Sequence, residues 1–332
     1  EEIFRQEGWH YEMKDTDSPI TINGVVYNEM KGAFSSPEDV LDREIFNSLF
    51  PDTPYGVESG GDPRYIPDLK YSQFLSFHSR YYHPSNSYIY LYGDMDMEER
   101  LNWMDQEYLS KYDAIPVESE IPRQKPFEQI REIEMEYPVS ESEPVEENSY
   151  LSYNLVAGDS LDVEQCTAFE VLDYVLLSAP GAPLKQVLLD AGIGKDILGS
   201  YEDGIYQPFF SIVAKNARPE NKDRFLSLIR ETLEKIVKEG IDQKAVAAGI
   251  NYMEFRFREA DYSSFPKGLM YGIDVFDSWL YDDSKPFDQL LRLNIYKNLK
   301  EKAKTGYFEK LIQEYLLDNT HASVVVVNPK RG

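Results

Sequence analysis

Cysteine, histidine and long apolar runs are scarce in this chain of 332 residues. Its only cysteine is Cys166, so an intrachain disulfide and any fold stapled by disulfides are excluded. The neighbours of Cys166 are typical of a helix interior, and we predict a buried, unreactive thiol. No run of about 18 apolar residues is present, so no segment resembles a membrane-spanning helix. The first residues show no signal-peptide pattern, but they are typical of a helix interior, so a targeting segment could precede them. The compartment stays open, with a cytoplasmic location favoured over a secreted one.

Histidine is too sparse to supply a zinc centre. The chain has four histidines, which are His10, His78, His83 and His321. Catalytic zinc takes about three protein ligands, commonly including two histidines close together on one helix face. His78 and His83 are five positions apart with no glutamate between them, and no second histidine follows His10 closely. We therefore predict that this chain alone builds no catalytic zinc site. His83, which precedes a proline, is predicted to be structural.

Acidic residues are abundant. The chain has 59 acidic against 34 basic residues, which gives a formal net charge of −25. Such a chain repels nucleic acids and anionic membranes, so we expect neither as a partner. It attracts cationic peptides, although an acidic surface that only keeps the protein soluble is the alternative.

The length favours about two domains, and composition divides the chain into three regions. Residues 114–146 are rich in proline and glutamate, as in an extended connector, with an edge strand predicted within residues 129–137. Residues 1–113 and 147–332 each mix helix and strand patterns, which predicts an α+β fold. Helices are predicted at residues 37–49, with a cap at 36–39, and at 71–82, 161–177, 225–237 and onwards from 183; strands are predicted at residues 88–92, 151–157, 209–214 and 324–326.

An offset of 234 residues relates the two large regions. It aligns Phe74 with Phe308 and Tyr81 with Tyr315, and it aligns the strand at 90–92 with that at 324–326. In both copies an amphipathic helix leads through a polar turn into an apolar strand. Helix-then-strand units are common, so this match suggests a duplicated α+β module without establishing one.

Glu29 is the candidate metal ligand in the first region. A lone glutamate on a helix is usually solvated or paired with a residue four positions away. Here apolar residues flank it, namely Val25, Val26, Met30, Ala33 and Phe34. That pattern predicts an inward-facing side, where a carboxylate needs a partner, and a metal ion would serve.

Four strings carry a family resemblance: Gln-Glu-Gly-Trp-His-Tyr-Glu at 6–12, Gly-Val-Val-Tyr-Asn-Glu-Met-Lys-Gly at 24–32, Ser-Gly-Gly-Asp-Pro at 59–63 and His-Pro-Ser-Asn at 83–86. Together they resemble the presequence protease branch of the pitrilysin and insulinase family of zinc metallopeptidases. The resemblance covers nearly the whole chain and is strongest from residue 6 to residue 94.

The resemblance implies a fold of duplicated α+β sandwich modules, the first one incomplete. Residues 1–113 would be the C-terminal part of the catalytic module, residues 114–146 the connector, and residues 147–332 the second, noncatalytic module. Glu29 matches the family's third zinc ligand. The other two ligands belong to a His-x-x-Glu-His motif, which this chain does not contain. No catalytic residue is therefore assigned here, and the chain alone is expected to be inactive and free of zinc.

For the intact protein, the resemblance implies zinc-dependent hydrolysis of unstructured peptides enclosed in a chamber. An acidic chain favours basic peptides among them. The expected partners are such peptides and the N-terminal and C-terminal parts of the same protein. The alternative is a noncatalytic binding or scaffolding module derived from such a peptidase. An upstream His-x-x-Glu-His motif in the parent gene would favour the enzyme, and its loss would favour the scaffold.

Overall fold

Two structural units interleave along the chain in the computed structural model, which describes residues 1–331. Unit 1 comprises residues 1–32, 59–121 and 264–272, and unit 2 comprises residues 33–58, 122–263 and the remainder from residue 273. The regions predicted at 1–113, 114–146 and 147–332 are continuous in sequence, whereas these units are defined by contacts in space. The predicted division into modules and a connector therefore stays a prediction. Among residues 1–331, no helix combines the length and apolarity that crossing a membrane requires.

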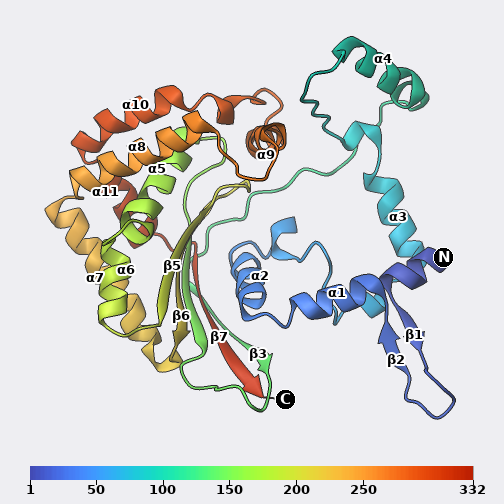
Figure 1. The fold of residues 1–332 in the computed structure, drawn as a ribbon, viewed down its shortest axis with the longest axis horizontal. Helices are drawn as coiled ribbons and strands as arrows, with labels where there is room; N and C mark the ends of the chain where they lie inside the picture. Colours follow the sequence, from blue (N-terminus) through green and yellow to red (C-terminus); the bar gives the residue numbers. More distant parts are fainter. Residues whose placement is uncertain (332) are drawn as a thin grey trace. The chain divides into compact units, whose positions relative to one another are not determined.

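Unit 2 is built on a five-stranded sheet with the strand order β3-β7-β4-β6-β5 (Figure 1). The strands are β3 (Arg131–Val139), β4 (Ser149–Val156), β5 (Asp196–Glu202), β6 (Phe209–Ala217) and β7 (Ala322–Arg331). β3 runs parallel to β7, and the other neighbouring pairs are antiparallel. The predicted edge strand is confirmed as β3, and the three strands predicted beyond it are confirmed as β4, β6 and β7. β5 lies outside the predicted strands.

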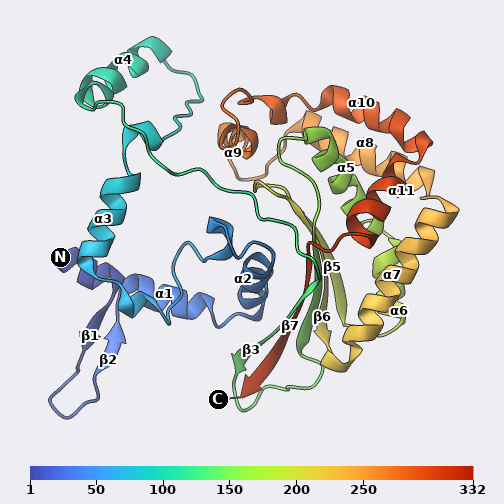
Figure 2. The same ribbon diagram turned by 180° about the vertical axis from the view of Figure 1, so that it is seen from behind.

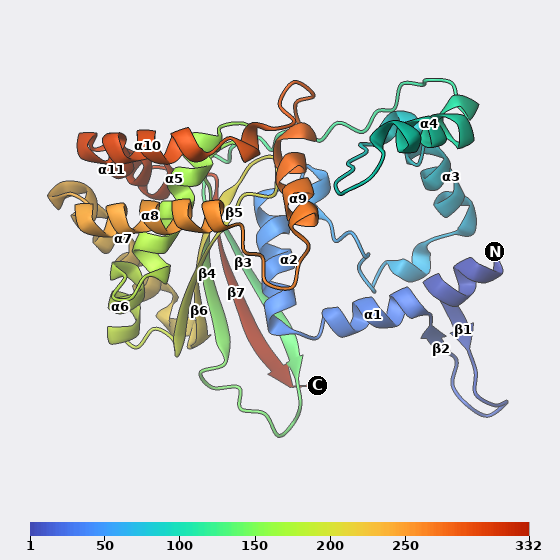
Figure 3. The same ribbon diagram turned by 45° about the horizontal axis from the view of Figure 1, so that its top comes forward.

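Helices cover one face of this sheet, as Figures 1 and 2 show from opposite sides. They are α5 (Val163–Asp173), α6 (Pro183–Asp190), α7 (Lys222–Glu239), α8 (Gln243–Glu259), α10 (Leu293–Lys302) and α11 (Tyr307–Leu311). α5, α8 and α10 pack on one another (Figure 3). The helices predicted at 161–177, at 225–237 and from 183 are confirmed. Gly192, with φ +66°, ends the turn after α6 because glycine adopts that conformation without strain.

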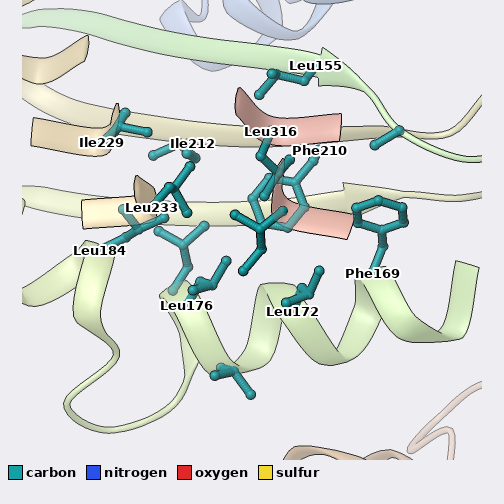
Figure 4. Packing of buried hydrophobic residues seen from close by; sticks show 14 of the residues in the cluster. Leu155, Phe169, Leu172, Leu176, Leu184, Phe210, Ile212, Ile229, Leu233 and Leu316 are labelled. Carbon is teal, nitrogen blue, oxygen red and sulfur yellow. The ribbon is translucent and has the colours of Figure 1, made fainter. Parts of the chain in front are cut away.

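The main core lies between these helices and the sheet (Figure 4). Phe169 and Leu172 of α5, and Leu176 of the helical turn Tyr174–Ser178 that follows it, are fully buried in one cluster with Phe210 and Ile212 of β6. Burying each such side chain contributes about 1.5–3 kcal/mol to folding. Cys166 is 1% exposed in the same helix, and burial raises the pKa of its thiol, which confirms the predicted inert cysteine.

α2 (Pro37–Leu49) packs on the opposite face of the sheet (Figure 1). The predicted cap is confirmed, because the Ser36 side chain accepts a hydrogen bond from the Asp39 main chain. The apolar side of α2 is buried against Tyr150 and against Val325 and Val327 of β7; its buried apolar residues are Val40, Leu41, Ile45 and Leu49. An amphipathic helix of this length is stable because its apolar side has a sheet to cover.

A buried polar seam joins α2 to the sheet. Ser48 Oγ donates to Ser323 Oγ at 2.8 Å, although the two residues lie 275 positions apart. Asn154 Nδ2 donates to Ser152 Oγ at 3.0 Å, and Asn154 Oδ1 accepts from Ser211 Oγ at 2.6 Å. All these side chains are at most 2% exposed. Each hydrogen bond is worth about 0.5–1.5 kcal/mol, and losing one partner would leave another polar group buried and unpaired.

The C-terminal part of the predicted connector is fixed to unit 2. The Gln124 main chain donates to Gln207 Oε1 at 2.6 Å and accepts from Gln207 Nε2 at 3.1 Å. The Gln124 side chain donates to Asp52 Oδ2 at 2.8 Å and accepts from the Asp52 main chain at 2.9 Å. This part of the connector is therefore an integral piece of the unit that it enters.

His321 lies beside this segment at the start of β7 and is 4% exposed. Its Nε2–H donates to the Leu49 carbonyl at 2.9 Å, and its ring packs on Phe127 with centroids 4.4 Å apart. Burial lowers the pKa of His321 despite the hydrogen bond to Leu49, and Arg131 lowers it further. The neutral imidazole therefore joins the end of α2 to the sheet.

We expect the free energy of unfolding to fall as the pH drops below about 6.5, the usual pKa of histidine. The unfolded chain then takes up a proton that folded His321 resists, so acid favours unfolding. Urea unfolding followed across this pH range measures the effect. His321→Gln should remove this component, whereas His78→Gln, at an exposed position, should keep it. Equal pH dependence in wild type and His321→Gln would contradict the assignment.

Unit 1 contains a small hairpin and separate helices. The hairpin pairs β1 (His10–Glu12) with β2 (Thr21–Asn23) in antiparallel fashion. The helices are α1 (Val25–Ala33), whose last residue already belongs to unit 2, α3 (Tyr71–Tyr81), α4 (Met97–Glu107) and the first half of α9 (Lys267–Trp279). The helix predicted at 71–82 is confirmed as α3.

The strand predicted at residues 88–92 is wrong. Within the described residues 1–331 this segment belongs to no sheet. Aromatic residues favour a strand only where a neighbouring strand offers a surface to pack on, and here Tyr90 and Tyr92 pack on Gly272 and Gly268 of α9 instead. Of the two aligned copies, both are helical at their first part, and only the copy near the C-terminus continues into a sheet strand.

Candidate functional site

Glu29 lies on the exposed side of α1. None of the α1 residues is buried, and Val25 is 52% exposed. The predicted inward-facing side is therefore wrong for this structure, because nothing else in the described part of the chain covers α1 there. Across residues 1–331, the Glu29 carboxylate has neither a hydrogen-bond nor an ion-pair partner.

The start of α1 is held firmly against the hairpin. Asn23 Oδ1 accepts from the Gly24 main chain at 2.8 Å and from Asn28 Nδ2 at 2.6 Å, while Asn23 Nδ2 donates to Glu12 Oε2 at 2.9 Å. Gly24 has φ +154°, and a side chain there would collide with the Gly8 carbonyl. Only glycine fits this close approach.

One further string of the sequence meets α1. A side chain at Gly60, in the Ser-Gly-Gly-Asp-Pro segment, would collide with Met30, the residue after Glu29. The structure thus brings together three of the strings found in the sequence, those at 6–12, 24–32 and 59–63.

The histidines lie apart from any metal-binding arrangement. His83 Nδ1 accepts a hydrogen bond from the Ser85 main chain at 3.1 Å, so it caps the turn at 84–86. His10 Nδ1 lies 2.7 Å from the Arg5 carbonyl, and His321 is buried in unit 2. Among residues 1–331 no three His, Cys, Asp or Glu side chains converge on a metal position. A single carboxylate does not fit a catalytic zinc ion, which needs about three protein ligands.

A groove in unit 2 lies between α2 and the strands β5 and β6, with a volume of about 310 Å³. Its lining residues are Glu38, Asp39, Leu41, Asp42, Ile45, Tyr150, Leu198, Ser200, Glu202, Phe209, Ser211, Val213 and Lys215. β5 is an edge strand with β6 as its sheet neighbour, so its outer edge has unpaired main-chain groups. Leu198 of β5 is 42% exposed at this edge.

Carboxylates outnumber cations in this groove. Glu38 accepts from Lys215 Nζ at 2.7 Å and from the Tyr150 hydroxyl at 2.9 Å. Although burial raises it, these hydrogen bonds bring the pKa of Glu38 below its usual value. Partial desolvation raises the pKa of Asp42, and repulsion from neighbouring carboxylates adds to it, Glu202 foremost. The rim has negative charge that Lys215 alone does not balance.

The sequence did not indicate a functional role for any of these groove residues. Alternation at residues 197–202 was the available signal, with Ile197 buried and Leu198 facing the groove. The segment also contains Asp, Gly, Ser and Glu, which are depleted in strands, so its pattern is weak.

Comparison with known proteins identifies the family. A family model described as "Peptidase M16 inactive domain" matches residues 68–253, just over half of the chain. The chain therefore belongs to the M16 peptidase family, and the resemblance to presequence proteases is confirmed. It is 45% identical over 334 residues to Protein HypA of Clostridium perfringens, covering 100% of this chain and 34% of that protein. It is 38% identical to Presequence protease 1, chloroplastic/mitochondrial, of Arabidopsis thaliana, covering 98% of this chain and 31% of that protein.

The chain thus spans about one third of the length of these relatives. Among solved structures, a protease from Helicobacter pylori has a TM-score of 0.68 at 17% identity, covering 92% of this chain and 70% of that one. The peptidase M16 inactive domain from Pseudomonas fluorescens has a TM-score of 0.65 at 16% identity, covering 92% of this chain and 69% of that one. These similarities confirm the predicted α+β fold.

Proposed function

We propose that this chain is the peptide-contacting, noncatalytic part of a longer zinc metalloendopeptidase that hydrolyses unstructured peptides in a closed chamber. The observation that carries the proposal is the groove beside the free edge of β5. Family membership and the names of the relatives support the class of activity.

An extended peptide suits this groove for physical reasons. Its main chain would hydrogen-bond to the unpaired groups of β5, as in strand addition to a sheet edge. Its apolar side chains would contact Leu198, Phe209 and Val213, while basic side chains would lie near Asp42 and Glu202. Main-chain pairing is independent of peptide sequence, so the charged rim would supply a preference for basic peptides.

We also propose Glu29 as the third zinc ligand of the complete enzyme. Its exposed carboxylate has no partner among residues 1–331 and stands on a helix whose start is fixed. The two histidine ligands and the general-base glutamate would come from outside residues 1–332, so the chain alone would bind no zinc and cleave no peptide.

The relation of this chain to the longer protein follows the same proposal. Residues 1–113 would be the C-terminal part of the catalytic module, residues 114–146 the connector, and residues 147–332 the second module of a duplicated pair. The N-terminal and C-terminal parts of the same protein would be partners of this chain. Neither nucleic acid nor a membrane is proposed as a partner, because the net charge of −25 repels both. The cytoplasmic location stays a prediction, which fractionation of the source cells would test.

A scaffolding or binding module derived from such a peptidase is the second candidate. The family model that matches residues 68–253 is described as an inactive domain, which supports this candidate. A parent gene without an upstream His-x-x-Glu-His motif would support this candidate, because no chain segment could then complete the zinc site.

Leu198→Lys tests the groove. We expect it to weaken binding of an unstructured, basic, fluorescein-labelled peptide to this chain by about tenfold. The substitution removes an apolar contact and adds a repelling charge, together worth about 1.4 kcal/mol. Fluorescence anisotropy gives the dissociation constant at low and high salt.

Leu293→Lys is the matched control, because Leu293 of α10 is 43% exposed, close to the 42% of Leu198. It should leave peptide binding unchanged. An acidic peptide of equal length should bind more weakly than the basic one at low salt, with a smaller difference at high salt. Equal affinity of wild type and Leu198→Lys would refute the groove as the peptide site.

A further inference from the structure

A second cavity, of about 310 Å³, lies on the helical side of unit 2 and, like the groove, has more carboxyl than cationic groups in its wall. Its carboxyl groups are Glu170 and Asp173 of α5, Asp203 after β5, and Asp274 and Asp277 of α9. The guanidinium groups in its wall are those of Arg256 and Arg292. Full ionisation would leave five negative charges facing two positive ones.

The two arginines do not form ion pairs with all of these carboxylates. Arg292 Nη1 donates to Glu170 Oε1 at 2.6 Å and its Nη2 donates to Gln289 Oε1 at 2.6 Å, while Asp203 Oδ2 lies 4.0 Å from Nη2. Arg256 lies over the ring of Tyr252, with its guanidinium carbon 5.8 Å from the ring centroid. Arg292 is therefore committed to Glu170 and Gln289.

The two aspartates of α9 have no such partner. Neither Asp274 nor Asp277 has a hydrogen bond or ion pair within residues 1–331. They are three positions apart and so lie on the same side of the helix. The second half of α9 is anchored in unit 2 by the buried residues Val275 and Ser278.

We propose that the second half of α9 is a pH-responsive element. It lies against this cavity while Asp274 and Asp277 are protonated, and it moves away when they ionise. The geometry carries the proposal: one helix places two unpartnered carboxyls into a cavity that already has an excess of them. The proposal is independent of the function proposed above.

The pKa shifts of the aspartates in this cavity agree with the proposal, because all of them are upward. Burial raises the pKa of Asp173 to about 6 and that of Asp277 to about 7, the latter with a contribution from Asp274. Burial, followed by the charge of Glu170, raises the pKa of Asp203 well above its usual value. The other titratable or charged groups that face α9 are Tyr55, Tyr201, Glu202, Arg256, Tyr281 and Arg292.

The sign of the effect follows. The closed state binds protons that exposed aspartates, with a pKa near 3.9, release. Closure is therefore most favoured below about pH 3.9, and this contribution is lost as the pH rises from there to about 6–7.

Hydrogen exchange of residues 273–279 in the whole chain tests this proposal. After correction for intrinsic exchange, we expect protection to fall at least about tenfold between pH 5.5 and pH 8, which corresponds to about one linked proton. In the Asp274→Asn/Asp277→Asn variant, the main chain should remain protected at both pH values, because the asparagine side chains do not ionise. Asp277→Asn alone should reduce the pH effect, and it serves if the double variant does not fold.

The control is Asp105→Asn/Glu231→Gln, which changes the net charge equally at exposed positions of α4 and α7. It should keep the wild-type pH dependence. Equal protection of wild type at both pH values would overturn the proposal, and so would a full pH effect in the double Asp→Asn variant.

Discussion

Glu29→Gln in the full-length protein is expected to abolish stoichiometric zinc binding and to lower peptide cleavage by at least about 100-fold. Changes around metal ligands already cost about 10–100-fold, and this one replaces a proposed ligand with a neutral amide that binds zinc poorly. The fold should survive, because Glu29 is exposed and the hydrogen bonds that fix α1 belong to other residues. Elemental analysis gives zinc per chain, and an unstructured fluorogenic peptide gives activity.

Glu98→Gln is the control for that substitution, since Glu98 is also an exposed glutamate on a helix of unit 1. It should retain zinc and activity. Full zinc content in Glu29→Gln would remove Glu29 from the metal site. Zinc missing from the wild-type parent would instead favour the scaffolding module, and this chain alone should contain no zinc in either case.

Arg292→Met is expected to lower the free energy of unfolding of unit 2 by about 3–5 kcal/mol. The Arg292 side chain is 13% exposed, and it is the cation that neutralises Glu170 at 2.6 Å. Methionine keeps the apolar stem but removes the ion-pair partner of Glu170 and the cation that lies 4.0 Å from Asp203. The loss should be larger at pH 8 than at pH 5.5, because protonation relieves the uncompensated charge.

Denaturant unfolding at the two pH values measures this loss. Arg230→Met is the control, since its ion pair with Glu234 is exposed on both sides, at 60% and 50%. Such surface pairs contribute about 0–1 kcal/mol. A loss below about 1 kcal/mol for Arg292→Met would mean that the carboxylates around it are stabilised by solvent rather than by this arginine.

Local signals in the sequence predicted the elements whose stability is local. Residues 37–49 have a capping serine and a regular apolar side, and both features are found in α2. The strand predicted at 88–92 is wrong because aromatic residues indicate that a segment packs on something, but not whether its neighbour is a strand or a helix. The inward orientation of Glu29 failed for the same reason, since apolar neighbours predict burial only where some other element covers them.

The candidate site was less accessible to prediction than the fold. The groove joins Leu41, Tyr150 and the neighbouring strands of Leu198 and Phe209, which come from three separate parts of the chain. Only the strand order places β5 and β6 beside α2, and no spacing in the sequence encodes that order. By contrast, the metal ligand proposed at Glu29 rests on short strings, of which three meet around α1.

The position of β7 affects when the sheet of unit 2 can form during protein synthesis. β7 is the final strand in the chain, yet it lies inside the sheet between β3 and β4. When synthesis has reached residue 300, β3 therefore still lacks its sheet neighbour, and α2 lacks one of the strands on which it packs. Pairing across such sequence separations is slow because a long loop must close first. Until β7 emerges, the nascent chain has an open sheet edge and an apolar side of α2 that is only partly covered. Chaperones bind such surfaces, which aggregate when they stay exposed.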